Sequence, residues 1–195
     1  MTPTSENREY AQFFAKAIGI NPTVFPYYDN DKTNSVDILS VDDPLDKNVT
    51  FYSTVGLSDF PNEIEMKDDS MLNIPVELLM TGYKKYDKIG NILSTTSFYI
   101  SKNSWQCQPG TVFKDIVTDY YNSEMKHIMF IRPFLWEDKL SDLQFGNKKI
   151  QCLLCVPISD KELQFKEKNG QDILEDILFG QKEIDIFNIE RESAI

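Results

Sequence analysis

The chain has 195 residues, of which 41% are hydrophobic and 12% aromatic, and a chain of this length buries about 70% of its unfolded surface without needing disulfides or a metal. Its formal net charge is −11, with 31 acidic against 20 basic side chains, so it lacks the basic face that direct binding to DNA or RNA requires. Three cysteines, the absence of a secretory signal and the absence of an apolar run of bilayer length predict one reduced, cytoplasmic domain over residues 1–195 with no membrane contact.

The first half of the sequence predicts one helix followed by strands. Residues 3–22 place their aromatic and aliphatic side chains on one helical face, and Gly19 ends that pattern. The next segments are rich in β-branched and aromatic residues, and Asn, Asp and Pro separate them. This composition predicts four strands, at residues 23–28, 35–41, 48–57 and 73–83.

The second half predicts a helix over residues 87–103 and two buried strands. These strands cover residues 126–136 and 149–159, and Pro133 and Pro157 are expected to end them because proline cannot donate to a sheet ladder. The order of elements shows no regular strand–helix–strand alternation. We therefore expect an α+β fold, with a mixed, mainly antiparallel β-sheet covered by helices.

The C-terminal region predicts two short helices. Ser159 and Glu162 have the spacing of a capping box, in which each side chain bonds the backbone N–H of the other residue, and Gly170 ends that first helix. Residues 171–180 repeat the apolar helical spacing. Residues 181–195 are rich in charge and are expected to form a partly frayed tail.

The residues that commonly carry catalysis or bind metals are sparse. His127 is the sole histidine and lies inside a strand-like run, which excludes a His–His metal pair and favours a structural role. Cys152 and Cys155 have redox-like spacing, but on a strand they point to opposite faces, so both are expected in the core. We expect no metal and no cofactor.

A polar loop follows the first predicted strand. Its alternating side chains resemble the first ligands of a calcium-binding EF-hand loop, but Asn34 replaces the required glycine and Ser40 replaces the bidentate glutamate. The segment therefore favours a hairpin loop over a calcium site. The alternating residues are Asp29, Asp31, Thr33, Ser35 and Asp37.

The stretch STVGLSDFP, residues 53–61, predicts a sharp end to a strand. Gly56 permits a backbone bend, and Leu57 can enter the core. Ser58 and Asp59 can hydrogen-bond the turning backbone, and Phe60 is left near the surface.

An ordered set of segments resembles the suppressor-of-fused-like (SUFU) domain family over residues 23–180. The segments are FYSTVGLSDFP with IPVELLM, YDKIGNILSTTSFYISKNSW, KHIMFIRPFL, and KIQCLLCVPISDKELQFKEKNGQDILEDIL. The resemblance implies an α/β sandwich without enzymatic activity. Animal members bind a transcription factor by taking up a short peptide as an added strand. Single-domain bacterial members act as antitoxins, or immunity proteins, that neutralise a toxin made by the same cell or by kin, and this chain is most similar to that branch.

The resemblance also implies a partner-binding surface. Phe60 stands where an aromatic residue lines the peptide site of the animal members, and Asp59 lies beside it. The resemblance also places Asp68 and Asp69 at this surface. Their positions match less closely, because the loop here differs in length from that of the animal members.

Three functional hypotheses remain open at this point. The first is an immunity protein that binds a cognate toxin, encoded nearby, whose domain could be a basic nuclease attracted by the −11 charge. The second is a general interaction module that binds a peptide by strand addition. The third is a hydrolase that uses the carboxylates of Asp59 and Glu77. The sequence does not specify the oligomeric state.

Overall fold

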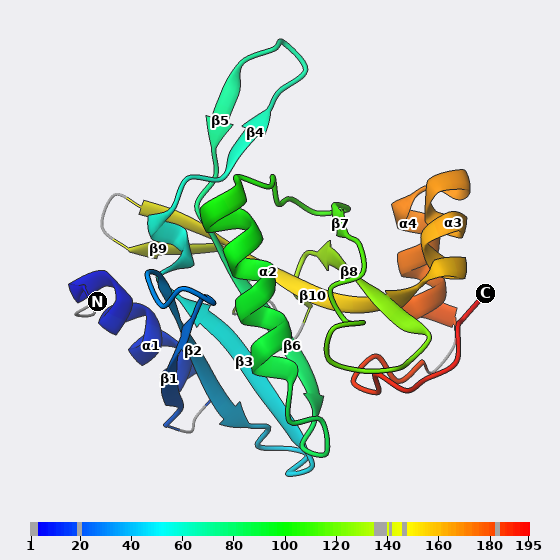
Figure 1. The fold of residues 1–195 in the computed structure, drawn as a ribbon, viewed down its shortest axis with the longest axis horizontal. Coiled ribbons are helices and arrows are strands. Elements are labelled where there is room, and N and C mark those ends of the chain that lie inside the picture. The colour runs from blue at the N-terminus through cyan, green and yellow to red at the C-terminus, as the bar shows by residue number, and fades with distance from the viewer. Residues whose placement is uncertain (1–3, 19–20, 135–139, 141, 146–147, 182–183) are drawn as a thin grey trace.

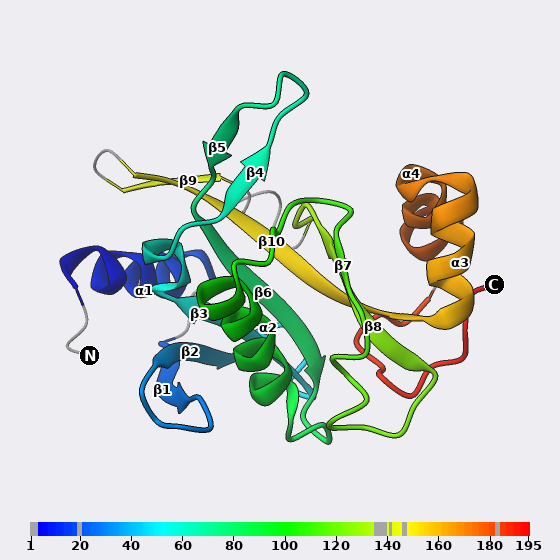
Figure 2. The ribbon, with the colours of Figure 1, turned by 45° about the horizontal axis from the view of Figure 1, so that its top comes forward.

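The computed structural model describes residues 4–18, 21–134, 140, 142–145, 148–181 and 184–195, and these form a large β-sheet with helices on both of its faces (Figures 1 and 2). Eight strands of the described residues make this sheet, seven of them in the order β1-β2-β3-β6-β10-β8-β7, while β9 pairs with β10. The strands are β1 Thr23–Tyr28, β2 Ser35–Asp42, β3 Val49–Val55, β6 Val76–Tyr83, β7 Val112–Phe113, β8 Met125–Ile131, β9 Asp142–Phe145 and β10 Lys148–Ser159.

Most neighbouring strands in the sheet run antiparallel, and β6 with β10 is the parallel pair of the described sheet. In the register of that pair, Leu78 lies opposite Leu153. Both strands are buried along nearly their whole length, as expected for central strands that are covered on two faces. The predicted mixed, mainly antiparallel α+β fold is confirmed.

The helices bury two separate apolar clusters against the two faces of the sheet. Helix α2, Ile89–Asn103, covers β2, β3 and β6 on one face, where Ile89, Ile92 and Leu93 are fully buried. The other cluster contains side chains from the remaining helices. These are α1 Ser5–Ile18, α3 Asp160–Asn169, α4 Gln171–Glu175 and the π-helix Asp176–Gln181.

Two predictions about isolated reactive residues hold in the structure. Cys155 belongs to the cluster under α2 and Cys152 to the opposite cluster, which confirms that they point to different faces of β10. His127 is buried, and its Nδ1 atom accepts a hydrogen bond from the backbone N–H of Asp115 at 2.9 Å. Its Nε2 atom lies 2.9 Å from a carboxylate oxygen of Asp160, so both ring nitrogens serve the fold.

The expectation that Pro157 ends its strand is wrong, because β10 continues to Ser159. The carbonyl of Pro157 accepts a hydrogen bond from Arg191 at 3.0 Å. In an antiparallel pair, the N–H and C=O of one residue point to the same side. The nitrogen of Pro157, which carries no hydrogen, therefore points away from β8. On that side the pairing of β10 with β6 has already ended at Leu154, so no hydrogen bond of the sheet is lost.

The expectation of a frayed C-terminal tail is also wrong for the described residues 184–195. Arg191 is only 8% exposed, and its guanidinium contacts both carboxylate oxygens of Glu162, at 2.6 and 3.0 Å. Glu162 also forms the predicted capping box with Ser159. The last segment is therefore fastened to the beginning of α3 by a buried ion pair.

Other boundaries differ modestly from expectation. The predicted strand 73–83 begins at Val76, after Pro75, and the residues before it form a separate hairpin of β4 Glu63–Glu65 and β5 Met71–Asn73. The predicted helix 171–180 is α-helical only to Glu175. Strand β8 ends at Ile131, before Pro133 as expected, while Gly19 and residues 135–136 lie outside the described residues. None of the described helices combines the length and the apolar character needed to cross a membrane.

Candidate partner-binding face

The turn that follows β3 is held by a buried carboxylate from the neighbouring strand β6. Gly56 has φ 92°, a left-handed conformation that favours glycine, and a Cβ atom there would lie 2.9 Å from the side chain of Asn7. The backbone N–H groups of Gly56 and Ser58 donate to Glu77 Oε1 at 2.9 and 3.1 Å, and the Thr54 hydroxyl donates to Oε2. The buried carboxylate of Glu77 therefore stabilises the turn through these hydrogen bonds.

The predicted turn residues have distinct positions. Leu57 is buried as expected, and the N–H of Asp59 donates to the carbonyl of Gly56 at 3.2 Å. The Asp59 carboxylate does not bond the turn but pairs with Lys148 Nζ at 2.6 Å. Phe60 is half-buried and packs against the cluster under α2. The turn is thus stabilised mainly from the backbone and from Glu77, a role that the sequence did not indicate for that glutamate.

The geometry of Asp59 and Glu77 does not form the acid–base pair of the hydrolase hypothesis. Glu77 is 1% exposed, and its two oxygens already accept hydrogen bonds from Thr54, Gly56 and Ser58. Burial raises its pKa above the ordinary glutamate value, and the hydrogen bond from Thr54 partly offsets that effect. Asp59 faces a lysine instead. The two carboxylates therefore have separate partners: Glu77 bonds the turn, and Asp59 pairs with Lys148 of β10.

Asp68 and Asp69 lie at the tip of the β4–β5 hairpin, which projects from the body of the molecule (Figures 1 and 2). Asp68 accepts hydrogen bonds from the N–H and hydroxyl of Ser70 at 3.2 and 2.6 Å, and these bonds lower its pKa. Asp69 adopts φ 62° in the turn. The structure therefore places these two carboxylates away from Asp59 and Phe60, which lie where the chain enters the hairpin.

The base of this hairpin is fixed by Asn62, which is buried. Its side-chain amide donates to the carbonyls of Ile74 and Cys107 at 3.0 and 2.8 Å, and its Oδ1 atom accepts from the Cys107 N–H at 2.9 Å. Three apolar side chains of the hairpin remain exposed nonetheless: Met66 at 41%, Met71 at 53% and Leu72 at 48%. A projecting hairpin with exposed methionine and leucine side chains has the composition of a contact surface.

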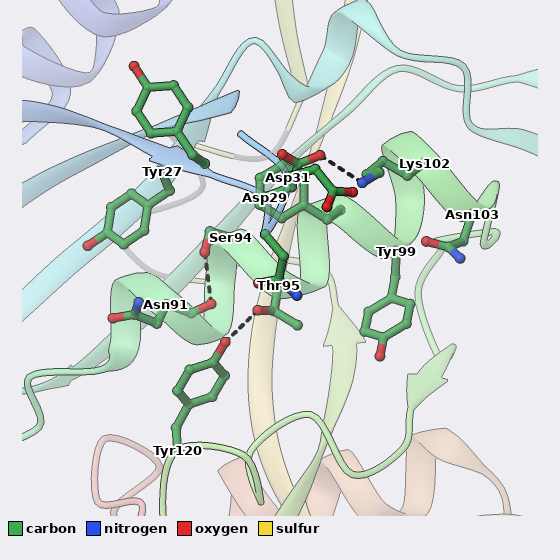
Figure 3. A pocket seen from close by; sticks show the side chains of 13 residues that line it. Tyr27, Asp29, Asp31, Asn91, Ser94, Thr95, Tyr99, Lys102, Asn103 and Tyr120 are labelled. Carbon is green, nitrogen blue, oxygen red and sulfur yellow. Dashed lines mark hydrogen bonds and ion pairs between the residues drawn. The ribbon is translucent and has the colours of Figure 1, made fainter. Parts of the chain in front are cut away.

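An open groove with a volume of about 420 Å³ runs beside the outer face of α2. Residues from the end of β1 and the β1–β2 loop form one wall, α2 forms the floor, and Tyr120 closes one end (Figure 3). Its aromatic lining consists of Tyr27, Tyr28, Phe98, Tyr99 and Tyr120. The sequence contained no signal for this groove, because its walls meet only through the tertiary fold.

Asp29 anchors the loop that forms one wall of the groove. Its carboxylate accepts hydrogen bonds from the Thr33 N–H at 2.8 Å, the Asn34 side chain at 2.9 Å and Lys102 Nζ at 2.7 Å. The Lys102 bond is the largest of several effects that hold the Asp29 pKa well below its usual range. This confirms a polar hairpin loop at this position. Among the described residues, no group of three or more His, Cys, Asp or Glu side chains is arranged to hold a metal.

Trp105 connects the groove to the hairpin. Its ring stacks on Tyr99, a groove residue, with the ring centroids 4.2 Å apart, and it remains partly exposed. Two residues later, Cys107 bonds the hairpin base through Asn62. We use the term partner-binding face for the hairpin of residues 62–74, Trp105 and the groove together.

The sequence is similar to known proteins over its whole length. The family described as Suppressor of fused protein (SUFU) matches residues 32–192. Immunity protein YqcF of Bacillus subtilis (strain 168) is 41% identical over 196 residues, which cover 100% of both chains.

Solved structures share the fold at low sequence identity. The crystal structure of a putative SUFU homologue from Neisseria gonorrhoeae FA 1090 matches with a TM-score of 0.71 and 14% identity, over 97% of each chain. The Sufu–Fu complex crystal structure matches with a TM-score of 0.68 and 12% identity, over 99% of this chain and 93% of that chain. These structures share the fold, and the family match over residues 32–192 shows that the chain belongs to the suppressor of fused protein (SUFU) family.

Proposed function

We propose that this protein is a cytoplasmic immunity protein that binds a cognate toxin domain and neutralises it by direct protein–protein contact. The observation that carries the proposal is the 41% identity to an immunity protein over the full length of both chains. A non-catalytic mode of action agrees with the separate partners of Asp59 and Glu77.

The partner-binding face supports this function through shape and charge. Asp68 and Asp69 sit at the tip of a projecting hairpin, where they can reach a partner. Asp59 and Phe60 support the base, with Asp59 pairing Lys148 and Phe60 packing on the core. A partner with a basic cleft, such as a nuclease, would be attracted by the net charge of −11.

Co-expression with the toxin domain encoded beside the gene tests the proposal directly. We expect the wild-type chain to restore growth and to form a complex with the purified toxin domain, because binding is the proposed mode of neutralisation. Failure to form a complex with that domain, together with failure to restore growth, would reject this function.

A charge-reversed hairpin tests the assigned face. The variant with Asp68→Lys and Asp69→Lys is expected to bind the toxin domain more weakly. The control variant carries Glu9→Lys on α1 and Asp176→Lys in the π-helix, two exposed sites outside the partner-binding face, and changes the net charge equally. Equal weakening by both variants would show that only total charge matters.

The electrostatic part of the proposal predicts a salt dependence. Raising the salt from about 50 to 500 mM shortens the Debye length from roughly 14 to 4 Å. The affinity of the wild-type chain for the toxin domain should therefore fall across this range, and the fall should be smaller for the hairpin variant. A flat response in the wild type would remove the basic cleft from the proposal.

Strand addition is the second candidate function, and the edge strand β1 favours it. Val24, Phe25 and Tyr28 are exposed there, and β1 pairs only with β2 among the described strands. Exposed edge strands are templates for an added strand. Pro26 interrupts this edge, however. Protection of β1 backbone amides from hydrogen exchange on partner binding would identify this mode, whereas protection confined to the hairpin would exclude it.

A further inference from the structure

We propose that the groove beside α2 binds an arginine side chain of a protein partner, with Asp31 as its anionic contact. This inference rests on the proposed function only for the identity of that partner. Trp105 lies between the hairpin and the groove. The groove would therefore provide a second contact on the same face.

The composition of the groove indicates a protein ligand. Pockets for buried small molecules are largely apolar and enclosed, whereas this groove is open and lined by tyrosine, asparagine, serine and threonine side chains. Tyrosine offers a large rigid contact area at low entropic cost, and small polar side chains offer adaptable hydrogen bonds, as in antibody paratopes. Asn91, Ser94 and Thr95 supply such polar groups along the floor.

The walls of the groove are held in place without any ligand. The hydroxyl groups of Thr95 and Tyr120 are hydrogen-bonded at 2.6 Å across one end. At the other end, Asp29 and Lys102 join the β1–β2 loop to α2 (Figure 3). Preformed walls lower the entropic cost of binding.

Gly90 allows the close approach of β1 to α2. A Cβ atom at this position would lie 2.3 Å from the hydroxyl oxygen of Tyr27, a groove residue. Any larger residue would have to displace that tyrosine. The groove wall therefore depends on a glycine within a helix, where glycine is otherwise unfavourable.

The charge at the Asp29 end of the groove favours a cation. Lys102 and Asp29 neutralise each other, whereas the exposed Asp31 has no hydrogen-bond partner among the described side chains. The same end of the groove is the C-terminal end of α2, which carries negative partial charge from the helix dipole. The local field therefore complements a positive group.

Arginine fits this combination of groups better than lysine. Its planar guanidinium stacks on aromatic faces and presents a fork of donors that matches a carboxylate, whereas the lysine ammonium is a compact, strongly hydrated point charge. Tyr28 and Tyr99 provide aromatic faces in the same groove as Asp31. A guanidinium that pairs with Asp31 and lies on one of these rings would be held by both an ion pair and cation–π attraction.

A titration followed by nuclear magnetic resonance tests the inference on the full-length ¹⁵N-labelled protein. The probes are N-acetyl-arginine methylamide and N-acetyl-citrulline methylamide, which have nearly the same shape but differ in charge. We expect the arginine probe to shift the backbone resonances of Asp31, Thr95 and Lys102 in a saturable manner, with millimolar affinity. The citrulline probe should shift them much less.

Substitution at Asp31 tests its assigned role. Asp31→Asn should weaken binding of the arginine probe about threefold, the size expected of a solvent-exposed ion pair. The matched control Glu9→Gln removes an equal charge on α1 and should leave the affinity unchanged.

Three results would overturn the inference: equal shifts with both probes, shifts scattered outside the groove, or an unchanged affinity in Asp31→Asn. These outcomes do not depend on the toxin. Specific binding of arginine by a chain that fails to neutralise the toxin would reject the proposed function and keep the groove assignment. Neutralisation of the toxin by a chain that does not bind arginine would keep the proposed function and reject the groove assignment.

Discussion

Two glutamates among the described residues are almost completely buried, and the fold accommodates them in different ways. Glu162 is 0% exposed and is paired with the Arg191 guanidinium, while the backbone N–H groups of Ser159 and Ala194 also donate to it. Glu77 is 1% exposed and accepts from neutral donors, which include the side chains of Thr54 and Ser58 and two backbone N–H groups. One carboxylate has a counter-charge, and the other has none among its hydrogen-bond partners.

The difference shows how each carboxylate depends on its surroundings. A buried charge with a charged partner is sensitive to the loss of that partner, because the remaining charge is left uncompensated. A buried carboxylate with neutral donors is sensitive to its own protonation, because burial favours the neutral form. The C-terminal segment should therefore respond mainly to mutation, and the turn after β3 mainly to pH.

The largest effect is expected from breaking the charged site. Arg191→Ala should lower the free energy of unfolding by about 3–5 kcal/mol, since it leaves Glu162 buried and unpaired. Urea denaturation followed by circular dichroism measures this loss. The double variant with Arg191→Met and Glu162→Leu is the control and should recover part of the stability. A loss below about 1 kcal/mol in Arg191→Ala would show that the pair is not buried in solution.

A smaller loss is expected at the neutral site. Glu77→Gln should destabilise the protein by about 1–3 kcal/mol, because the amide group turns an N–H₂ towards the donors of the turn. The same denaturation experiment measures it, with Glu65→Gln on the exposed hairpin strand as the matched control. If both variants lose the same small amount, Glu77 does not hold the turn.

The pH dependence distinguishes the two sites further. Because the pKa of Glu77 is raised in the folded protein, the folded state binds more protons than the unfolded state between the two pKa values. The contribution of Glu77 is therefore fully present below the ordinary glutamate pKa and is lost as the pH rises through the raised value. The stability advantage of the wild type over Glu77→Gln should shrink with rising pH, by about 1.4 kcal/mol for each unit of pKa shift. An advantage that grows with pH would contradict the assignment.

The smallest effect is expected at the exposed ion pair of the same turn. Lys148→Ala removes the partner of Asp59, whose side chain is 38% exposed. Solvent screening limits such pairs to about 0–1 kcal/mol, so the midpoint of urea denaturation should barely move. A large loss would mean that Asp59 is buried more deeply than the structure shows, and added salt should reduce any loss that does occur.

Local patterns in the sequence were sufficient for most elements of the fold. The capping box of Ser159 and Glu162, the bend at Gly56 and the opposite directions of Cys152 and Cys155 are all set by spacings of a few residues. Each of these depends on neighbours along the chain, and each is present in the structure.

Features that depend on distant residues could not be predicted in the same way. Arg191 meets Glu162 across 29 positions, and its charged sequence context suggested an exposed tail. Asn62 bonds Cys107 across 45 positions, so the rigid base of the hairpin had no local signal. The α2 groove likewise joins residues near 30 to residues near 100. The candidate site was therefore predicted in part, at the hairpin tip, but not in its full extent.

The parallel pairing of β6 with β10 has a consequence for how the chain folds. Leu78 and Leu153 are opposite each other at the centre of the sheet. Along the chain, however, α2, β7, β8 and β9 all lie between them. Bringing such distant segments together is slow, because the entropy of the intervening loop is lost before the contacts form. Until then, one side of β6 is an open hydrogen-bonding edge that invites aggregation. Slow closure of this strand pair, more than the final stability, should therefore limit the yield of folded protein when it is made quickly.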